Sequence, residues 1–181
     1  MRLGLGYVHL SQGNYASALE LLAPALDTCR KESFAIALPF IGACMGSACV
    51  GSNRAADAVL LLEEALSRLA AMGMFCFRSF VLTASAKAYM SLGKTAKAVE
   101  VAQQSATLAH SHEEPGWEAW ALKTIGDILS RKSTSRRQAE DAYRQAQAIA
   151  VRLGMNPLLA ECQLGLDKVK LPAKGRTRAK D

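Results

Sequence analysis

Apolar residues recur along this chain at intervals of three and four, and this spacing predicts helices throughout. We expect helices over residues 2–12, 15–30, 34–50, 54–72, 77–92, 95–110, 115–131, 136–153 and 157–170. Short polar clusters such as Gln12-Gly13-Asn14 and Leu92-Gly93-Lys94 separate them and predict tight turns. Pro39 falls inside the third predicted helix and is expected to kink that helix or delay its start.

The predicted helices form pairs that repeat about every forty residues. Small residues occupy three linked positions of each pair. On the first helices they are Gly6, Gly46, Ala86, Gly126 and Gly165; on the second helices they are Ala18, Ala58, Ala98 and Ala139, followed seven residues later by Ala25, Ala65, Ser105 and Ala146. Small side chains let paired helices approach closely, so we predict that these residues define the packing of each repeat.

The segment from Leu5 to Ala25 resembles the tetratricopeptide repeat, whose pattern is L-G-x-x-(H/Y)-x-x-x-G-x-Y-x-x-A-x-x-x-x-x-x-A. The resemblance implies an all-α fold, a right-handed superhelix of antiparallel helix pairs, with helices longer than in the usual 34-residue unit. We expect one domain over residues 1–171, with units of about 1–32, 33–74, 75–112 and 113–154 and an extra helix at 157–170. Residues 172–181 are expected to form a basic, disordered tail.

Charge and cysteine content narrow the functional classes. From Lys168 onwards there are six basic residues and one acid, so the net charge of +6 describes mainly the tail, and the body is nearly neutral. The tail lacks aromatic residues for base stacking, so nucleic acid is not the expected partner.

Five cysteines without CxxC spacing favour a reducing cytoplasm. The uncharged run from Ser33 to Asn53 contains Pro39 and matches the repeat register, which predicts a buried helix and no membrane span.

Sequence motifs for catalysis are missing. The chain has no GxxxxGK[ST] phosphate loop and no GxSxG elbow, so we predict neither enzymatic activity nor a cofactor. The cluster His110-Ser111-His112-Glu113-Glu114 has two readings, a metal site or a polar turn between repeats. Two histidines in a loop do not share a helical face, and we predict the turn and no metal.

Three aromatic residues, Phe40, Phe80 and Trp120, recur at steps of forty on the first helices. First helices line the concave surface of such arrays, so these rings are either anchors for a partner or packing between repeats. The candidate groove residues are Tyr7, Phe40, Phe80, Thr83, Lys87, Met90, Trp120, Lys123 and Asp127. We predict that the chain binds a protein or peptide partner in this groove, and the sequence leaves open whether the rings at 40, 80 and 120 face it or pack between repeats.

A second resemblance covers residues 115–128, 142–146 and 153–166. These segments are similar to the C-terminal array of bacterial signalling proteins that carry a class III adenylate/guanylate cyclase domain and a P-loop ATPase domain. The likeness implies a scaffold or sensor arm of such a protein. Two alternatives are an effector-binding arm of a transcription regulator and a stand-alone protein that self-associates as a homo-oligomer through uncapped ends. The chain enters the first predicted helix directly at Met1, with no N-cap residue before it, which favours a segment of a longer array.

Overall fold

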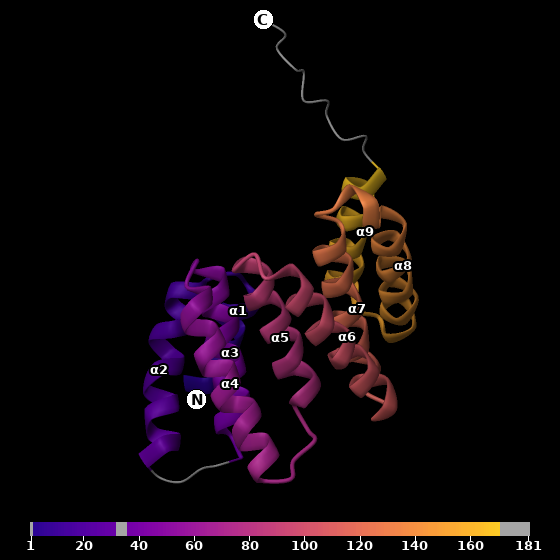
Figure 1. Ribbon diagram of the computed structural model, residues 1–181. Coiled ribbons are helices and arrows are strands. Elements are labelled where there is room, and N and C mark those ends of the chain that lie inside the picture. Colours follow the sequence, from indigo (N-terminus) through magenta and orange to yellow (C-terminus); the bar gives the residue numbers. More distant parts are fainter. Residues whose placement is uncertain (1, 32–35, 171–181) are drawn as a thin grey trace, which may run out of the picture.

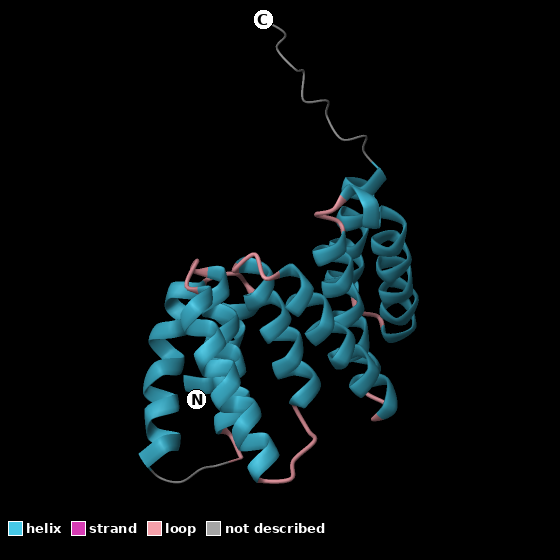
Figure 2. Cartoon of the chain, in the orientation of Figure 1, coloured by secondary structure: helices cyan, strands magenta, loops and turns pink. Residues whose placement is uncertain are grey.

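The computed structural model describes residues 2–31 and 36–170, and within these ranges every regular element is helical (Figures 1 and 2). The prediction of an all-α fold is therefore confirmed. The helices are α1 (Arg2–Ser11), α2 (Tyr15–Lys31), α3 (Leu38–Gly51), α4 (Ala55–Ala71), α5 (Arg78–Ser91), α6 (Thr95–Ser111), α7 (Pro115–Leu129), α8 (Arg136–Leu153) and α9 (Asn156–Lys170), with a short 3₁₀ helix η1 (Ser133–Ser135) between α7 and α8. The predicted tail at 172–181 lies outside the described residues.

Proline explains the largest difference from the predicted boundaries. The sequence predicted the third helix from residue 34, but residues 36 and 37 form a turn and α3 begins at Leu38. Pro39 then stands in the first turn of the helix, where its missing N–H would have had no partner. The prediction for residues 34 and 35 lies outside the described residues. Pro24 lies in the middle of α2, and that helix continues through it.

The turns repeat as regularly as the helices. Within the first three helix pairs, the backbone takes a left-handed conformation at Gly13, Asn53 and Gly93, which are forty residues apart. Between successive pairs it does so at Gly73, Glu113 and Gly154. Glycine and asparagine tolerate this conformation best, so sequence and backbone agree at these turn positions except at Glu113. Phe77, directly before α5, is also left-handed, with a φ of 66°.

Successive first helices contact one another: α1 lies against α3, α3 against α5, α5 against α7 and α7 against α9. Among the described residues, no comparable contact joins successive second helices. The first helices are therefore the more closely spaced side of the stack, and they form its inner surface (Figure 1). We use "inner surface" below for the solvent-facing side of α1, α3, α5, α7 and α9.

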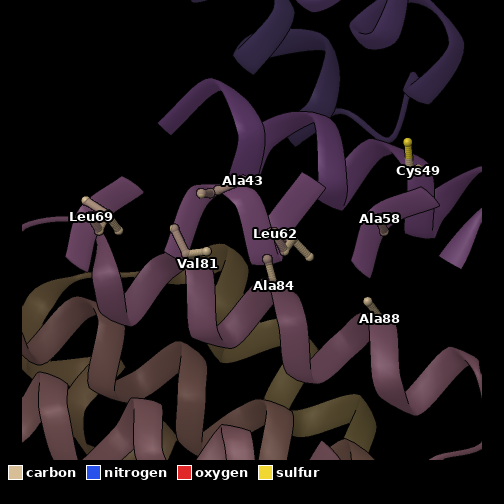
Figure 3. Packing of buried hydrophobic residues seen from close by; sticks show 9 residues of the cluster. Ala43, Cys49, Ala58, Leu62, Leu69, Val81, Ala84 and Ala88 are labelled. Atoms are coloured by element: carbon tan, nitrogen blue, oxygen red, sulfur yellow. The ribbon is translucent and has the colours of Figure 1, made fainter. Parts of the chain in front are cut away.

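The core is continuous between repeats. Figure 3 shows one part of it, where residues of α3, α4 and α5 pack in one cluster, with Ala43 and Leu69 near Val81 and with Cys49 near Ala58. Helices α3 and α5 are enclosed by neighbours on several sides, and most of their residues are buried. Because α3 is enclosed on several sides, it carries no charged residue. No helix of the described chain is long and apolar enough to span a membrane.

Within each pair, a small residue on the first helix faces a larger one on the second. A Cβ atom at Gly6 would lie 2.7 Å from Leu22, one at Gly46 2.7 Å from Leu62, and one at Gly126 2.8 Å from Tyr143. The third pair replaces this arrangement with Ala86 and Ala102, both buried in one cluster. The Tyr143 ring also leaves no room for a Cβ at Gly165 of α9.

The remaining small residues are also buried, with one exception. Ala18, Ala58, Ala98 and Ala139 have no exposed surface, and neither do Ala65, Ser105 and Ala146. Ala25 is only half-buried. It lies on α2, the second helix of the first pair.

Candidate partner-binding surface

A row of aromatic rings crosses the first helices from α1 to α7. The centroid of Tyr7 lies 5.9 Å from that of Phe40, and Phe40 lies 5.7 Å from Phe80. Phe80 in turn stacks on Trp117 with centroids 4.6 Å apart. Phe77, just before α5, adds a second contact to Phe40 at 5.3 Å. We call these five residues the aromatic row.

The predicted rings on the first helices pack partly against the core and are partly exposed to solvent. Phe40 and Phe80 pack against a buried cluster. Trp120, which follows Trp117 by one helical turn, packs against another buried cluster. All three rings are nevertheless only half-buried. Tyr7 is 43% exposed. The sequence left open whether the rings at 40, 80 and 120 are packing residues or anchors. The structure gives each of them a packed side and an accessible side.

Charged residues of α5, α7 and α9 continue the surface beyond the rings. The Lys87 ammonium lies over the Trp120 ring, 5.1 Å from its centroid. Lys123 Nζ lies 2.9 Å from Asp127 Oδ2 and 2.6 Å from Glu161 Oε2, so one cation joins α7 to α9. The hydroxyl of Tyr143 donates to Asp127 Oδ1 at 2.8 Å and ties α8 to the same group.

The two lysines differ in electrostatic environment. Burial, together with the neighbouring charge of Lys123, lowers the pKa of Lys87. Burial acts in the same direction on Lys123, but the carboxylates of Asp127 and Glu161 outweigh it and raise its pKa above the usual value. The positive charge of Lys123 is thus balanced by two carboxylates of the fold. By contrast, no carboxylate of the described chain lies within 4 Å of the Lys87 ammonium.

Thr83 does not lie on the surface predicted for it. Only 4% of it is exposed, and its hydroxyl shares a hydrogen bond of 2.9 Å with Ser105 of α6. The side chain of Thr83 thus faces the second helix of its own pair, and it is not part of the inner surface. Met90 is half-buried and packs against the cluster formed with Ile125 and Ile128, which leaves it part of the inner surface.

Sequence reasoning missed an open pocket of about 450 Å³ at the start of α7. It is lined by Glu114, Pro115, Gly116, Trp117, Trp120 and Met155. The sequence held a signal for it, because Phe77 and Trp117 also stand forty residues apart, each three residues before a recognised ring. Residues three apart share a helical face, so this second series could have been read alongside Phe80 and Trp120.

The histidine cluster forms polar contacts at the surface. His110 Nδ1 lies 3.1 Å from Glu118 Oε1, and the ring of His112 lies 5.4 Å from that of Phe75. Across the described residues, no group of three or more histidine, cysteine, aspartate or glutamate side chains is arranged to hold a metal ion.

The fold matches that of solved repeat proteins. Crystal structures of nearly identical TPR-like repeats from a Podosopora anserina kinesin light chain-like protein superpose on 93% of this chain, with a TM-score of 0.64 at 19% identity and 92% of the other chain covered. A variant of the same repeats gives 0.65 at 18% identity, with 82% of that chain covered. No protein-family model and no curated protein matches the chain. At this identity the likeness establishes a tetratricopeptide-like fold.

Proposed function

We propose that the chain is a protein-interaction module, a scaffold or sensor, whose inner surface binds a protein or peptide partner. The observation that carries this proposal is the unbroken aromatic row from Tyr7 on α1 to Trp117 on α7. Partly exposed aromatic side chains that pack against the core provide large apolar contact area at little entropic cost, which suits them to anchor a partner.

The chemistry of the surface favours a partner with apolar anchor residues. Lys123 and Asp127 already pair with each other, so the rings of the aromatic row are the main feature that this surface offers a partner. A partner helix or an extended peptide with large apolar side chains at regular spacing would fit such a row.

Peptide selection followed by hydrogen-exchange mapping tests the proposal. Peptides would be selected from a random library against the full chain, and amide exchange would be measured with and without the tightest one. We expect slower exchange in α3, α5 and α7, whose side chains form the row. Slower exchange confined to α4 and α6, or failure to select any peptide, would argue against the inner surface as the binding site.

We further propose that the module belongs to a cytoplasmic bacterial cyclase/ATPase signalling protein and that partner binding there modulates nucleotide chemistry. The support is the resemblance of residues 115–128, 142–146 and 153–166 to such arrays, together with cysteine usage typical of a reducing compartment. Sequencing the complete reading frame tests the idea. Cyclase and ATPase domains encoded in frame would support it, and a DNA-binding domain in their place would favour the transcription-regulator alternative.

Self-association is a second candidate, favoured by the apolar residues that α1 exposes. Leu5 and Val8 are each 47% exposed on the outermost helix of the stack. If they mediate assembly, light scattering should give a dimer or larger species for the native chain and a monomer for the Leu5→Ser/Val8→Ser double variant. A monomer in both cases would exclude this candidate.

A further inference from the structure

Both tryptophans of the chain line the same pocket. Trp117 and Trp120 are its only tryptophans, both lie in the first two turns of α7, and Met155 also lines the pocket. The pocket is open and large enough for one long side chain. Its walls therefore include two indole rings and a thioether, groups that attract both aliphatic chains and cations.

A buried hydroxyl network holds the one carboxylate of this pocket in place. Ser79 has no exposed surface, and its hydroxyl donates to Glu114 Oε2 at 2.7 Å. The Ser79 carbonyl accepts a hydrogen bond of 2.7 Å from Ser105, whose own hydroxyl oxygen lies 2.9 Å from Thr83 Oγ1. Since Ser105 uses its only proton on Ser79, Thr83 must be the donor to Ser105.

This network runs from α6 through α5 and ends on Glu114, which borders the pocket. One carboxylate oxygen of Glu114, Oε2, accepts the hydrogen bond from Ser79. Within the described chain, no hydrogen bond or ion pair is made by the other oxygen. Charge-assisted hydrogen bonds are the strongest that a carboxylate makes, so the free oxygen has capacity for a cationic donor.

The Lys87 ammonium of the inner surface does not fill that role. Lys87 lies over Trp120 but is not among the residues that line the pocket. Asp127, Glu161 and Lys123, the charged groups that act on it, all lie toward the other end of α7 or on α9. Glu114 is therefore the only charged residue among those that line the pocket, and it gives the pocket a negative character.

We infer that this pocket binds a lysine or arginine side chain of the partner. The aliphatic stem would lie against Trp117, Trp120 and Met155, and the charged head would reach Glu114. The inference rests on the proposed function and adds to it the chemical class of one anchor residue: a cation placed beside the apolar anchors that lie along the aromatic row.

The pocket contains its own reporter, because both tryptophans respond to an occupant. N-acetyl-arginine amide and N-acetyl-lysine amide would be titrated into the full chain while tryptophan fluorescence and the indole N–H chemical shifts are recorded. The neutral N-acetyl-citrulline amide and the anionic N-acetyl-glutamate amide serve as controls of similar size. We expect saturable shifts with the two cations and none with the neutral or anionic probe.

Two matched substitutions assign the effect to Glu114. Glu114→Gln keeps an acceptor for Ser79 but removes the charge, and it should weaken binding of the cations about five- to tenfold. Glu113→Gln removes the same charge one residue away, outside the pocket, and should leave the affinity unchanged. Circular dichroism melting curves would verify that both variants are folded.

Several results would overturn the inference. These are equal affinity for arginine and citrulline amides, binding of the glutamate probe, equal weakening by the two substitutions, or no saturable shift with either cation. The proposed function is tested separately. If the cation probes fail while a selected peptide still protects α3, α5 and α7, only the inference about the pocket is lost.

Discussion

Glu113 is the residue at which the repeated turn departs from its best amino acid. Its φ is +54°, whereas the equivalent positions of the neighbouring turns are Gly73 and Gly154. A side chain in the left-handed region costs about 1–2 kcal/mol. Glycine avoids this cost, but its greater freedom in the unfolded chain offsets part of the gain.

We therefore expect Glu113→Gly to raise the free energy of unfolding by about 0.5–1 kcal/mol, measured by urea denaturation. Gly93→Ala provides the opposite control, since Gly93 has a φ of +73° and the new side chain should lower stability. A neutral or destabilising effect of Glu113→Gly would mean that the turn is not strained.

The cysteines should differ sharply in reactivity. Burial raises the pKa of Cys44 to about 12 and that of Cys162 to about 11, whereas Cys76 is exposed. Because the thiolate is the reactive form, a disulfide reagent at pH 8 should label Cys76 first and the two buried thiols only on unfolding. Mass spectrometry of timed samples checks the order.

The same shift predicts how stability depends on alkaline pH. The unfolded thiol of Cys44 loses its proton near pH 9.0, whereas the folded thiol keeps it until about pH 12, so the unfolded state binds fewer protons between these values. The contribution of this group is complete below pH 9 and is lost as the pH rises. Urea denaturation at pH 8 and pH 10 should show a smaller loss for Cys44→Ala than for the native chain.

At the scale of helices, the size pairs predict a coupling that can be measured. Gly46→Ala places a methyl group against Leu62 and should cost about 1–3 kcal/mol, as overpacking does. Leu62→Ala alone should cost about 2–5 kcal/mol through the cavity it leaves. The double variant recreates the alanine pair that the third unit has at Ala86 and Ala102.

We expect the double variant to be more stable than the sum of the two single effects predicts, by at least about 1 kcal/mol. Chemical denaturation of the four proteins of the cycle measures this coupling. Additive effects would show that Gly46 and Leu62 do not constrain each other, and the size pairs would then have no energetic meaning.

The helices themselves could be predicted because each carries its own local signals. Pro39 indicated a kink or a late start of α3, and the series of small residues at forty-residue spacing predicted the pairing of the helices. What could not be predicted is how far each side chain of a first helix turns toward its neighbours. That rotation depends on packing against both adjacent pairs, and it buries Thr83 against Ser105 while leaving Phe80 accessible two turns from Lys87.

The candidate site was predicted in part for the same reason. The rings at 40, 80 and 120 could be found by their period, but the sequence could not tell a packed ring from an exposed one. Glu114 was read as part of a polar turn. Its link to Ser79 joins residues 35 positions apart and becomes visible only when α5 and α7 are placed side by side.

At the scale of the whole molecule, the stack predicts a gradient of local stability. Helix α5 contacts helices on both sides, α3, α4, α6 and α7, whereas the contacts of α1 among the described helices are with α2 and α3. Repeat arrays are stabilised by nearest-neighbour interfaces, so the ends should open more often than the centre. Hydrogen exchange followed by mass spectrometry should show faster exchange in α1 than in α5. Equal rates would indicate a single cooperative unit.

The central claim concerns the surface that binds the partner, and matched pairs of variants test it most directly. Tyr7 and Trp117 stand at the two ends of the aromatic row, whereas Leu60 and Val151 are apolar residues of the second helices, 69% and 66% exposed. The Kd of one selected peptide would be measured by calorimetry for the native chain and for both double serine variants. We predict at least tenfold weaker binding, about 1.4 kcal/mol, for Tyr7→Ser/Trp117→Ser and an unchanged Kd for Leu60→Ser/Val151→Ser. The reverse pattern, or equal weakening in both, would contradict the assignment of partner binding to the inner surface.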